Sequence, residues 1–158
     1  MKVIVCGAGQ VGFGSARQLG AEQNGVTVID QSPRLVHQMS DTLDVRAFVG
    51  HGAHPDVLER AGAASADMLI AVTFHDEVNM IACQVAHSVF KVPTKIARIR
   101  AQSYLQPGFQ DLFSQDHLPI DVIISPELEV GKAVLRRLAV PGAFDILNFA
   151  DGKVSVVG

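Results

Sequence analysis

Short, continuous apolar runs alternate along this chain with longer segments in which apolar residues recur every three or four positions. Short continuous runs are typical of strands buried on both faces of a parallel sheet, and the longer period is typical of helices that cover such a sheet. The pattern predicts strands at residues 3–6, 26–29, 45–49, 68–72, 95–100 and 122–124, and helices at 11–22, 33–42, 55–61, 76–90, 109–114 and 127–139.

The first two strands enclose a glycine turn, Gly7-Ala8-Gly9-Gln10-Val11-Gly12, and the second strand ends at Asp30. Strand, turn, helix, strand and acid form the dinucleotide-binding fingerprint. Gly7 allows the sharp turn, Gly9 lets a pyrophosphate approach the backbone, and Gly12 lets the helix pack closely on the sheet. The helix N-terminus attracts phosphate, and the Asp30 carboxylate can accept hydrogen bonds from ribose hydroxyls.

Two kinds of nucleotide site, a P-loop and an NADP site, are disfavoured by the residues at single positions. Phe13-Gly14 stands where a P-loop requires Lys followed by Ser or Thr, so backbone groups rather than a P-loop lysine would hold the phosphates. The carboxylate of Asp30 would repel a 2′-phosphate, which favours NAD(H), ATP or ADP over NADP.

The alternation of strands and helices predicts a doubly wound α/β fold of the Rossmann type, with six parallel strands in the order 3-2-1-4-5-6. Two later apolar runs, 144–150 and 153–157, flank Asp151-Gly152 and predict a β-hairpin. We expect a nucleotide-binding domain over residues 1–140, ending in a crossover helix. Residues 141–158 would then form an exit segment that leads to a further lobe.

Polar residues near the ends of the later strands are candidate ligand contacts. Arg98 and Arg100 alternate along a predicted strand and would share one face near its carboxyl end, where they could hold phosphates or pair with carboxylates of a neighbouring subunit. Thr73 could donate its hydroxyl to a phosphate. Arg34 could stack near adenine, or be an ordinary exposed helix arginine.

The histidines and cysteines are weaker candidates for a functional site than the glycine turn. His51 and His54 are spaced as metal ligands but have no third ligand nearby, so solvated or ribose-adjacent histidines are favoured. His75 and Asp76 could form a catalytic pair, but a helix start in which Asp76 accepts from first-turn N–H groups is favoured. We interpret Cys6 and Cys83 as buried, free thiols, as in a reducing compartment.

Composition limits the partners. The net charge is −3, which gives no electrostatic support for binding to nucleic acid, and no apolar run approaches the ~20 residues of a membrane span. The charged fraction of 18% is low, which suggests surface covered by another subunit. Helix 76–90 supports this because it carries two apolar stripes, one more than a sheet needs; the second could instead lie under a loop.

Several blocks of the chain resemble the regulator-of-potassium-conductance (RCK, or KTN) nucleotide-binding domain, and most closely the N-terminal domains of subunits from Trk-type potassium uptake systems. The resemblance covers nearly the whole chain, and its later blocks are more specific than the glycine turn. The matching blocks are residues 7–12, 28–30, 50–55, 66–73, 76–84, 96–100 and 148–154.

The resemblance implies a cytoplasmic, non-catalytic subunit, peripheral to the inner membrane, that forms a homo-oligomer from dimer to ring. It would bind NAD(H) or ATP/ADP and gate a membrane potassium transporter subunit. It gives a ligand role to the three glycines, Asp30, Thr73, Arg98 and Arg100, and adds Asn79. Many members carry an acid where this chain has His51. The site that we predict comprises Gly7, Gly9, Gln10, Val11, Gly12, Asp30, Gln31, Arg34, His51, Gly52, Thr73, Asn79, Arg98 and Arg100.

Two alternative functions remain open. The chain could be a Rossmann fragment of an NAD-dependent dehydrogenase, although no substrate domain and no Tyr-xxx-Lys pair are visible, since Gly108 follows four residues after Tyr104. It could also be an RCK regulator of a different cation transporter, which composition does not distinguish from potassium uptake.

Overall fold

The computed structural model describes residues 1–126, 130–131, 134–135, 146–149 and 154–157. The chain divides into two compact units, Met1–Ile124 and Ser125–Gly158, which we describe separately. All of the candidate site residues belong to the first unit.

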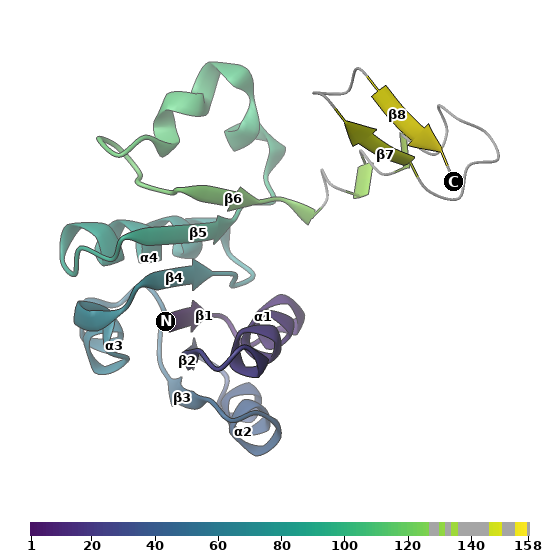
Figure 1. The fold of residues 1–158 in the computed structure, drawn as a ribbon. Coiled ribbons are helices and arrows are strands. Elements are labelled where there is room, and N and C mark those ends of the chain that lie inside the picture. The colour runs from purple at the N-terminus through teal and green to yellow at the C-terminus, as the bar shows by residue number, and fades with distance from the viewer. Residues whose placement is uncertain (127–129, 132–133, 136–145, 150–153, 158) are drawn as a thin grey trace. The chain divides into compact units, whose positions relative to one another are not determined.

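The first unit is built on one six-stranded sheet (Figure 1). Its strands lie in the order β3-β2-β1-β4-β5-β6, and every neighbouring pair is parallel. The predicted fold class and strand order are therefore confirmed. The strands are β1 (Lys2–Cys6), β2 (Gly25–Asp30), β3 (Arg46–Val49), β4 (Met68–Ala71), β5 (Thr94–Arg98) and β6 (Val122–Ile124).

The α-helices of this unit follow their sequence signals closely. They are α1 (Gln10–Ala21), α2 (Pro33–Thr42), α3 (Pro55–Arg60) and α4 (Asp76–Ser88). The bounds of α2 agree with the prediction because Pro33 occupies its first turn and Ser32 caps it, the Ser32 Oγ accepting from the Leu35 N–H at 3.4 Å. The short helix predicted at 109–114 is instead two 3₁₀ segments, Gln102–Leu105 and Pro107–Phe113.

Alternate residues of the central strands enter two separate apolar layers. Val3 and Val5 of β1 pack with α1 and α2 through residues such as Ala16 and Met39. The intervening β1 residues pack with α3 and α4, in a layer that includes Leu58. Burial on both faces explains why β1 and β4 appear in the sequence as continuous apolar runs.

The two cysteines lie in this core. Cys6 and Cys83 are free thiols with no exposed surface, which confirms the interpretation of both as buried apolar groups. Burial raises the pKa of the Cys6 thiol far above its ordinary value and raises the pKa of Cys83 to about 12. Both thiols are therefore protonated at neutral pH, and no group of potential metal ligands occurs among the described residues.

Helix α4 buries one of its two apolar stripes and exposes part of the other. Met80 and Cys83 face the sheet together with small residues of the same helix, whereas Ile81 is 47% exposed and Val89 is 57% exposed. The subunit interface predicted for this helix stays a prediction.

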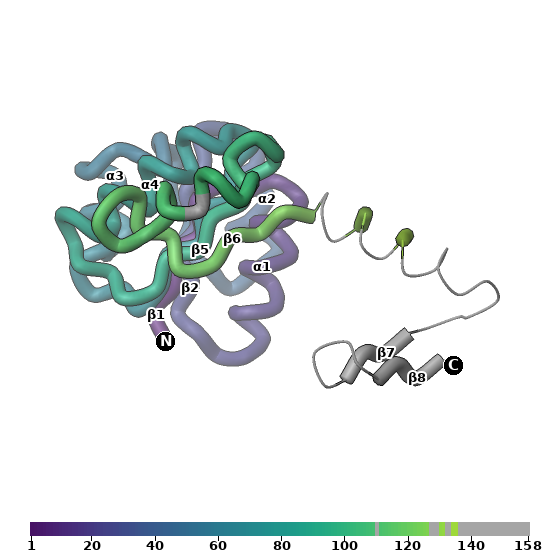
Figure 2. The backbone as a smooth tube through the Cα atoms, turned by 90° about the horizontal axis from the view of Figure 1, so that it is seen from above, coloured from purple at the N-terminus to yellow at the C-terminus, as the bar shows by residue number. Residues whose placement is uncertain are grey.

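An ion pair between the buried Lys95 and the more exposed Asp121 joins β5 to the segment that enters β6. The strands β5 and β6 run beside each other in Figure 2. The side chain of Lys95 is 2% exposed, and its Nζ lies 2.8 Å from a carboxylate oxygen of Asp121. The same oxygen accepts from the Lys95 backbone N–H at 2.6 Å. This contact lies at the amino end of β5, opposite the strand end that carries Arg98.

In the second unit, β7 (Ile146–Phe149) and β8 (Val154–Val157) pair as antiparallel strands, as the hairpin prediction requires. The predicted turn residues Asp151 and Gly152 lie outside the described residues, as does most of the helix predicted at 127–139. No helix among the residues that the structure describes is long and apolar enough to cross a membrane.

Candidate functional site

A cavity of about 480 Å³ opens at the carboxyl ends of the strands, at the point where β1 lies between β2 and β4. Ligands of open α/β sheets bind at this topological switch point. The cavity is lined by Gly7, Gly9, Gln10, Val11, Ile29, Asp30, Gln31, Leu35, Gly50, Gly52, Val72, Thr73, Phe74, His75, Val78 and Arg98.

The glycine turn is shaped by close backbone contacts. Gly7 has a φ of +110°, and a Cβ there would lie 2.9 Å from the Thr73 N atom. A Cβ on Gly12 would lie 1.8 Å from the Gly7 carbonyl oxygen, so α1 can begin against the turn only because Gly12 lacks one. A Cβ on Gly9 would meet nothing within 4 Å, so this position faces open space. The turn therefore presents bare backbone and the N-terminus of α1 to the cavity.

The Asp30 carboxylate joins the glycine turn to α2. One oxygen accepts from the Ala8 N–H at 2.7 Å, and the other accepts from the Ser32 N–H at 2.8 Å. An ionised carboxylate has about four acceptor positions, so two remain for a ligand hydroxyl. Asp30 thus both fixes the turn and offers acceptors to the cavity that it lines.

The ends of β4 and β5 are joined by the side chain of Asn79, in the first turns of α4. Its Oδ1 accepts from the Thr73 N–H at 2.9 Å and from the Thr73 hydroxyl at 2.7 Å. Its Nδ2 donates to the Thr73 carbonyl at 3.2 Å and to the Arg98 carbonyl at 2.9 Å. Asn79 has no exposed surface and does not line the cavity, but Thr73 and Arg98 both do.

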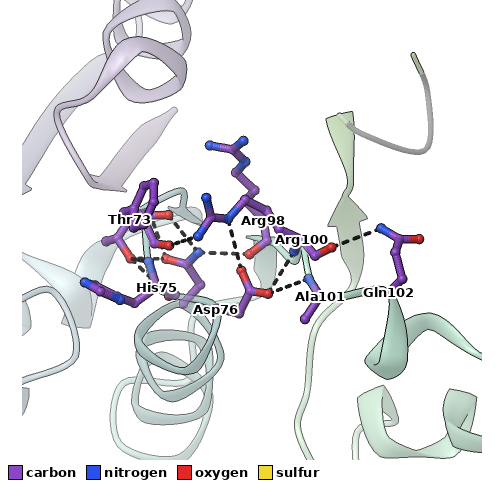
Figure 3. A network of polar contacts seen from close by, with 9 residues as sticks. Thr73, His75, Asp76, Arg98, Arg100, Ala101 and Gln102 are labelled. Atoms are coloured by element: carbon purple, nitrogen blue, oxygen red, sulfur yellow. Dashed lines mark hydrogen bonds and ion pairs between the residues drawn. The ribbon is translucent and has the colours of Figure 1, made fainter. Parts of the chain in front are cut away.

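A second set of contacts surrounds Asp76 at the start of α4 (Figure 3). One Asp76 carboxylate oxygen accepts from the backbone N–H groups of Arg100 and Ala101, at 2.9 and 2.8 Å. The prediction that Asp76 binds first-turn N–H groups of its own helix is therefore wrong, because these partners follow β5 instead. The carboxylate is engaged by these donors, which argues against its use in a catalytic pair with His75.

Arg100 turns toward α4 and the end of β4. Its guanidinium donates to the Phe74 carbonyl and stacks on the Phe74 ring, with 3.9 Å from Cζ to the ring centroid. Its Nε lies 3.8 Å from the second Asp76 oxygen. Since β5 ends at Arg98, Arg100 lies outside the strand, and the prediction of two arginines alternating on one strand is wrong. Figure 3 shows the two side chains pointing in different directions.

The remaining predicted residues are not part of the cavity wall. The rings of His51 and His54 are stacked, with centroids 4.4 Å apart, and the His51 Nδ1 accepts from the Ala53 N–H at 3.3 Å. Arg34 is exposed on α2, and Gly12 is buried beneath the turn. The structure therefore brings nine predicted residues into the lining: Gly7, Gly9, Gln10, Val11, Asp30, Gln31, Gly52, Thr73 and Arg98.

Phe74 and His75 line the cavity but were absent from the predicted ligand set. Both follow Thr73 directly, at the carboxyl end of β4, and Phe74 is 70% exposed. A large apolar side chain just after a central strand is the signal that could have identified Phe74, because ligands gather at that edge of a parallel sheet.

The sequence family is decided by a match to the TrkA-N domain model over residues 3–126. The chain belongs to the TrkA-N domain family. This TrkA-N domain is 65% identical over 158 residues to the Trk system potassium uptake protein TrkA of Azorhizobium caulinodans, covering 100% of the chain and 34% of that protein. It is 49% identical over 157 residues to TrkA of Halomonas elongata, and the match covers 99% of the chain and 34% of that protein. It thus spans about a third of the length of these relatives.

Solved structures share the fold of this TrkA-N domain. The TrkA-N domain of the inner membrane protein ybaL from Escherichia coli superposes with a TM-score of 0.73 at 20% identity, covering 87% of this chain and 96% of that one. The GsuK channel bound to NAD gives a TM-score of 0.73 at 15% identity, and the match covers 95% of this chain and 25% of the GsuK chain. GsuK bound to ADP gives a TM-score of 0.70 at 16% identity, and the match covers 86% of this chain and 34% of the GsuK chain. At these identities the likeness shows the fold alone.

Proposed function

We propose that this TrkA-N domain is the nucleotide-binding part of a regulatory subunit of a Trk-type potassium uptake system. The observation that carries the proposal is the cavity at the switch point, where a bare glycine turn, the Asp30 carboxylate and Arg98 converge. A carboxylate for ribose and an arginine for phosphate match an adenine nucleotide. The names of the relatives, Trk system potassium uptake proteins, support potassium uptake as the process.

The ligand that we propose is NAD(H), ATP or ADP, bound across the carboxyl ends of β1, β2 and β4. GsuK, which shares the fold, is described in complexes with NAD and with ADP. The phosphates would lie against Gly9 and the first turn of α1, where the backbone is open. The ribose would meet the remaining acceptors of Asp30, whose negative charge disfavours a 2′-phosphate.

The domain is proposed to act as a ligand switch without a catalytic step. Of the acids in and beside the cavity, Asp30 accepts two backbone N–H groups and Asp76 accepts two more. Both carboxylates therefore serve to hold the backbone of the glycine turn and of the segment after β5. A nucleotide would then shift the assembly between two states by its difference in affinity for them. The partner would be a membrane potassium transporter subunit, contacted by a cytoplasmic homo-oligomer.

Isothermal titration calorimetry on the full-length protein tests this function. We expect binding of NAD(H), ATP or ADP and at least tenfold weaker binding of NADP. The full-length protein should also co-purify with its membrane transporter, and potassium uptake in vesicles should depend on the bound nucleotide. Absence of binding to all of these nucleotides would overturn the proposal, and so would turnover of a nicotinamide cofactor with a metabolite.

A further inference from the structure

Asn79 is the one fully buried polar side chain whose hydrogen-bond partners both line the cavity, among the described residues. Its carboxamide makes two acceptor and two donor contacts, all with Thr73 and Arg98. These contacts use both hydrogens of the amide and both acceptor positions of its oxygen. No hydrogen-bonding capacity is left over for a ligand, so the side chain can act on a nucleotide only through these two neighbours.

The position of these contacts in the sheet explains why a side chain is needed there. The last paired residues of β4 and β5 are Ala71 and Ala97. Beyond these residues the two strands are no longer paired: Thr73 leads into α4, and Arg98 ends β5. Buried backbone groups need partners, and the Asn79 carboxamide supplies them in place of the ladder. It offers a carbonyl to one strand end and N–H groups to both, as a peptide unit would.

We propose that Asn79 is a positioning residue for the nucleotide site, which sets the spacing of Thr73 and Arg98 across the cavity. The inference rests on the proposed function and adds the side chain that holds Thr73 and Arg98, two residues of the cavity wall, at a fixed distance from each other. Thr73 donates its hydroxyl proton to Asn79 at 2.7 Å, so the expectation that it donates to a phosphate is not met, and the same oxygen accepts from the His75 N–H at 3.3 Å. The Arg98 carbonyl is held at 2.9 Å, which fixes the backbone from which the guanidinium extends.

The variant Asn79→Asp tests the proposal because it keeps the shape and removes the donors. A carboxylate oxygen would then face the Thr73 and Arg98 carbonyls, which repel it. We expect at least a tenfold loss of affinity for ADP or NAD, measured by calorimetry on the full-length protein. An affinity equal to that of the unaltered protein would overturn the inference.

Loss of general stability is separated from positioning by a matched control. Asp121→Asn is the reverse isosteric change and disrupts the contact with the buried Lys95 at the opposite end of β5. We expect it to lower the melting temperature while leaving nucleotide affinity within twofold of the unaltered value. If Asn79→Asp does not fold, Asn79→Ser repeats the test, because it removes the bond to Arg98 without burying a charge.

Action through the two neighbours is tested by combining variants. If Asn79 acts by positioning, the loss caused by Asn79→Asp should be at least threefold smaller in an Arg98→Ala background and in a Thr73→Ala background. If Asn79→Asp reduces nucleotide affinity by the same factor in both backgrounds as in the unaltered protein, Asn79 acts on the ligand independently of Thr73 and Arg98, and the inference is overturned. If the unaltered protein binds none of the nucleotides, the proposed function fails first, which is a distinguishable result.

Discussion

Asp30 shows how one side chain can serve both the fold and a ligand. The sequence motif predicts its ribose contact, but not the N–H groups of Ala8 and Ser32 that it accepts. Those donors come from the flanking turns, and their approach depends on how the turns close in three dimensions. The carboxylate is therefore held in place before any ligand arrives, which lowers the entropic cost of binding.

Removing this carboxylate should weaken nucleotide binding strongly. We expect Asp30→Ala to lower affinity for NAD(H) or ADP at least tenfold, because both the ribose acceptor and the support of the glycine turn are lost. Calorimetry measures the change. Asp44→Ala removes an exposed acid before β3, at the opposite edge of the sheet, and should leave affinity unaltered. An unchanged affinity for Asp30→Ala would exclude Asp30 from the site.

Arg100 is expected to discriminate between nucleotides that differ by one phosphate. Its guanidinium stacks on Phe74, a residue of the cavity wall, beside the proposed phosphate site. A charge-assisted hydrogen bond contributes ~1.5–3 kcal/mol, or about 10–150-fold in affinity. Arg100→Ala should therefore weaken ATP more than ADP in parallel titrations, whereas Arg17→Ala, which removes an exposed arginine of α1 outside the cavity lining, should change neither. Equal losses for both nucleotides would contradict this role.

Two glycines of the same helix should respond in opposite directions to alanine. Gly12→Ala places a Cβ 1.8 Å from the Gly7 carbonyl oxygen, so the helix must shift, which costs about 1–3 kcal/mol or more. Gly14→Ala meets nothing within 4 Å and should stabilise α1 by about 0.5–1 kcal/mol. Urea unfolding of both variants measures the difference. Similar free energies of unfolding would show that the close contact is not limiting.

At the scale of elements, boundaries with local signals were predictable and boundaries set by neighbours were not. Ser32-Pro33 marks the start of α2 within the sequence itself. The end of β5 depends instead on β6, which is short and pairs no further than Arg98. Beyond that point Asp76 takes the N–H groups of Arg100 and Ala101, so the chain leaves the sheet. Nothing in the alternation of residues 95–100 could indicate this.

The attachment of β6 to β5 should depend on pH through Asp121. Burial raises the pKa of this carboxyl, but hydrogen bonds and the ion pair from Lys95, with a hydrogen bond from Gln115, outweigh burial and hold the pKa below its ordinary value of 3.8. The stabilisation is thus present above the pKa of the unfolded chain, about 3.9, and is lost as pH falls through the folded value.

The variant Asp121→Asn measures that contribution. Its free energy of unfolding should fall below that of the unaltered protein by a margin that is constant above about pH 5 and shrinks below about pH 4. Urea titrations at several pH values give both curves. A margin independent of pH would show that the ionised carboxylate is not what stabilises this contact.

At the scale of the whole domain, the continuous apolar runs were enough to predict the sheet. Burial of β1 and β4 on both faces excludes polar residues from them, and this leaves a clear record in the sequence. The candidate site was only partly predictable. The glycine turn is contiguous and could be found, but the bridge from Asn79 to Thr73 and Arg98 joins positions that only the folded sheet brings together.

The two thiols report on the integrity of this core. Cys6 and Cys83 are fully buried, and burial raises the pKa of the Cys6 thiol far above its ordinary value and that of Cys83 to about 12, so thiolate is scarce at pH 8. A thiol reagent such as DTNB should therefore label neither cysteine in the native chain and both in urea. Labelling of one thiol at the rate of a free cysteine, before unfolding, would contradict the packing of its apolar layer.

The strand order also governs when a ribosome-bound chain can complete the candidate site. The cavity proposed to bind the nucleotide combines the turn after β1 with residues at the ends of β4 and β5, which are separated from it by more than sixty positions. A nascent chain that has emerged only through β3 already displays the complete glycine motif, yet lacks the opposite wall. Binding competence can then appear only after β4 and β5 have been synthesised and have docked beside β1.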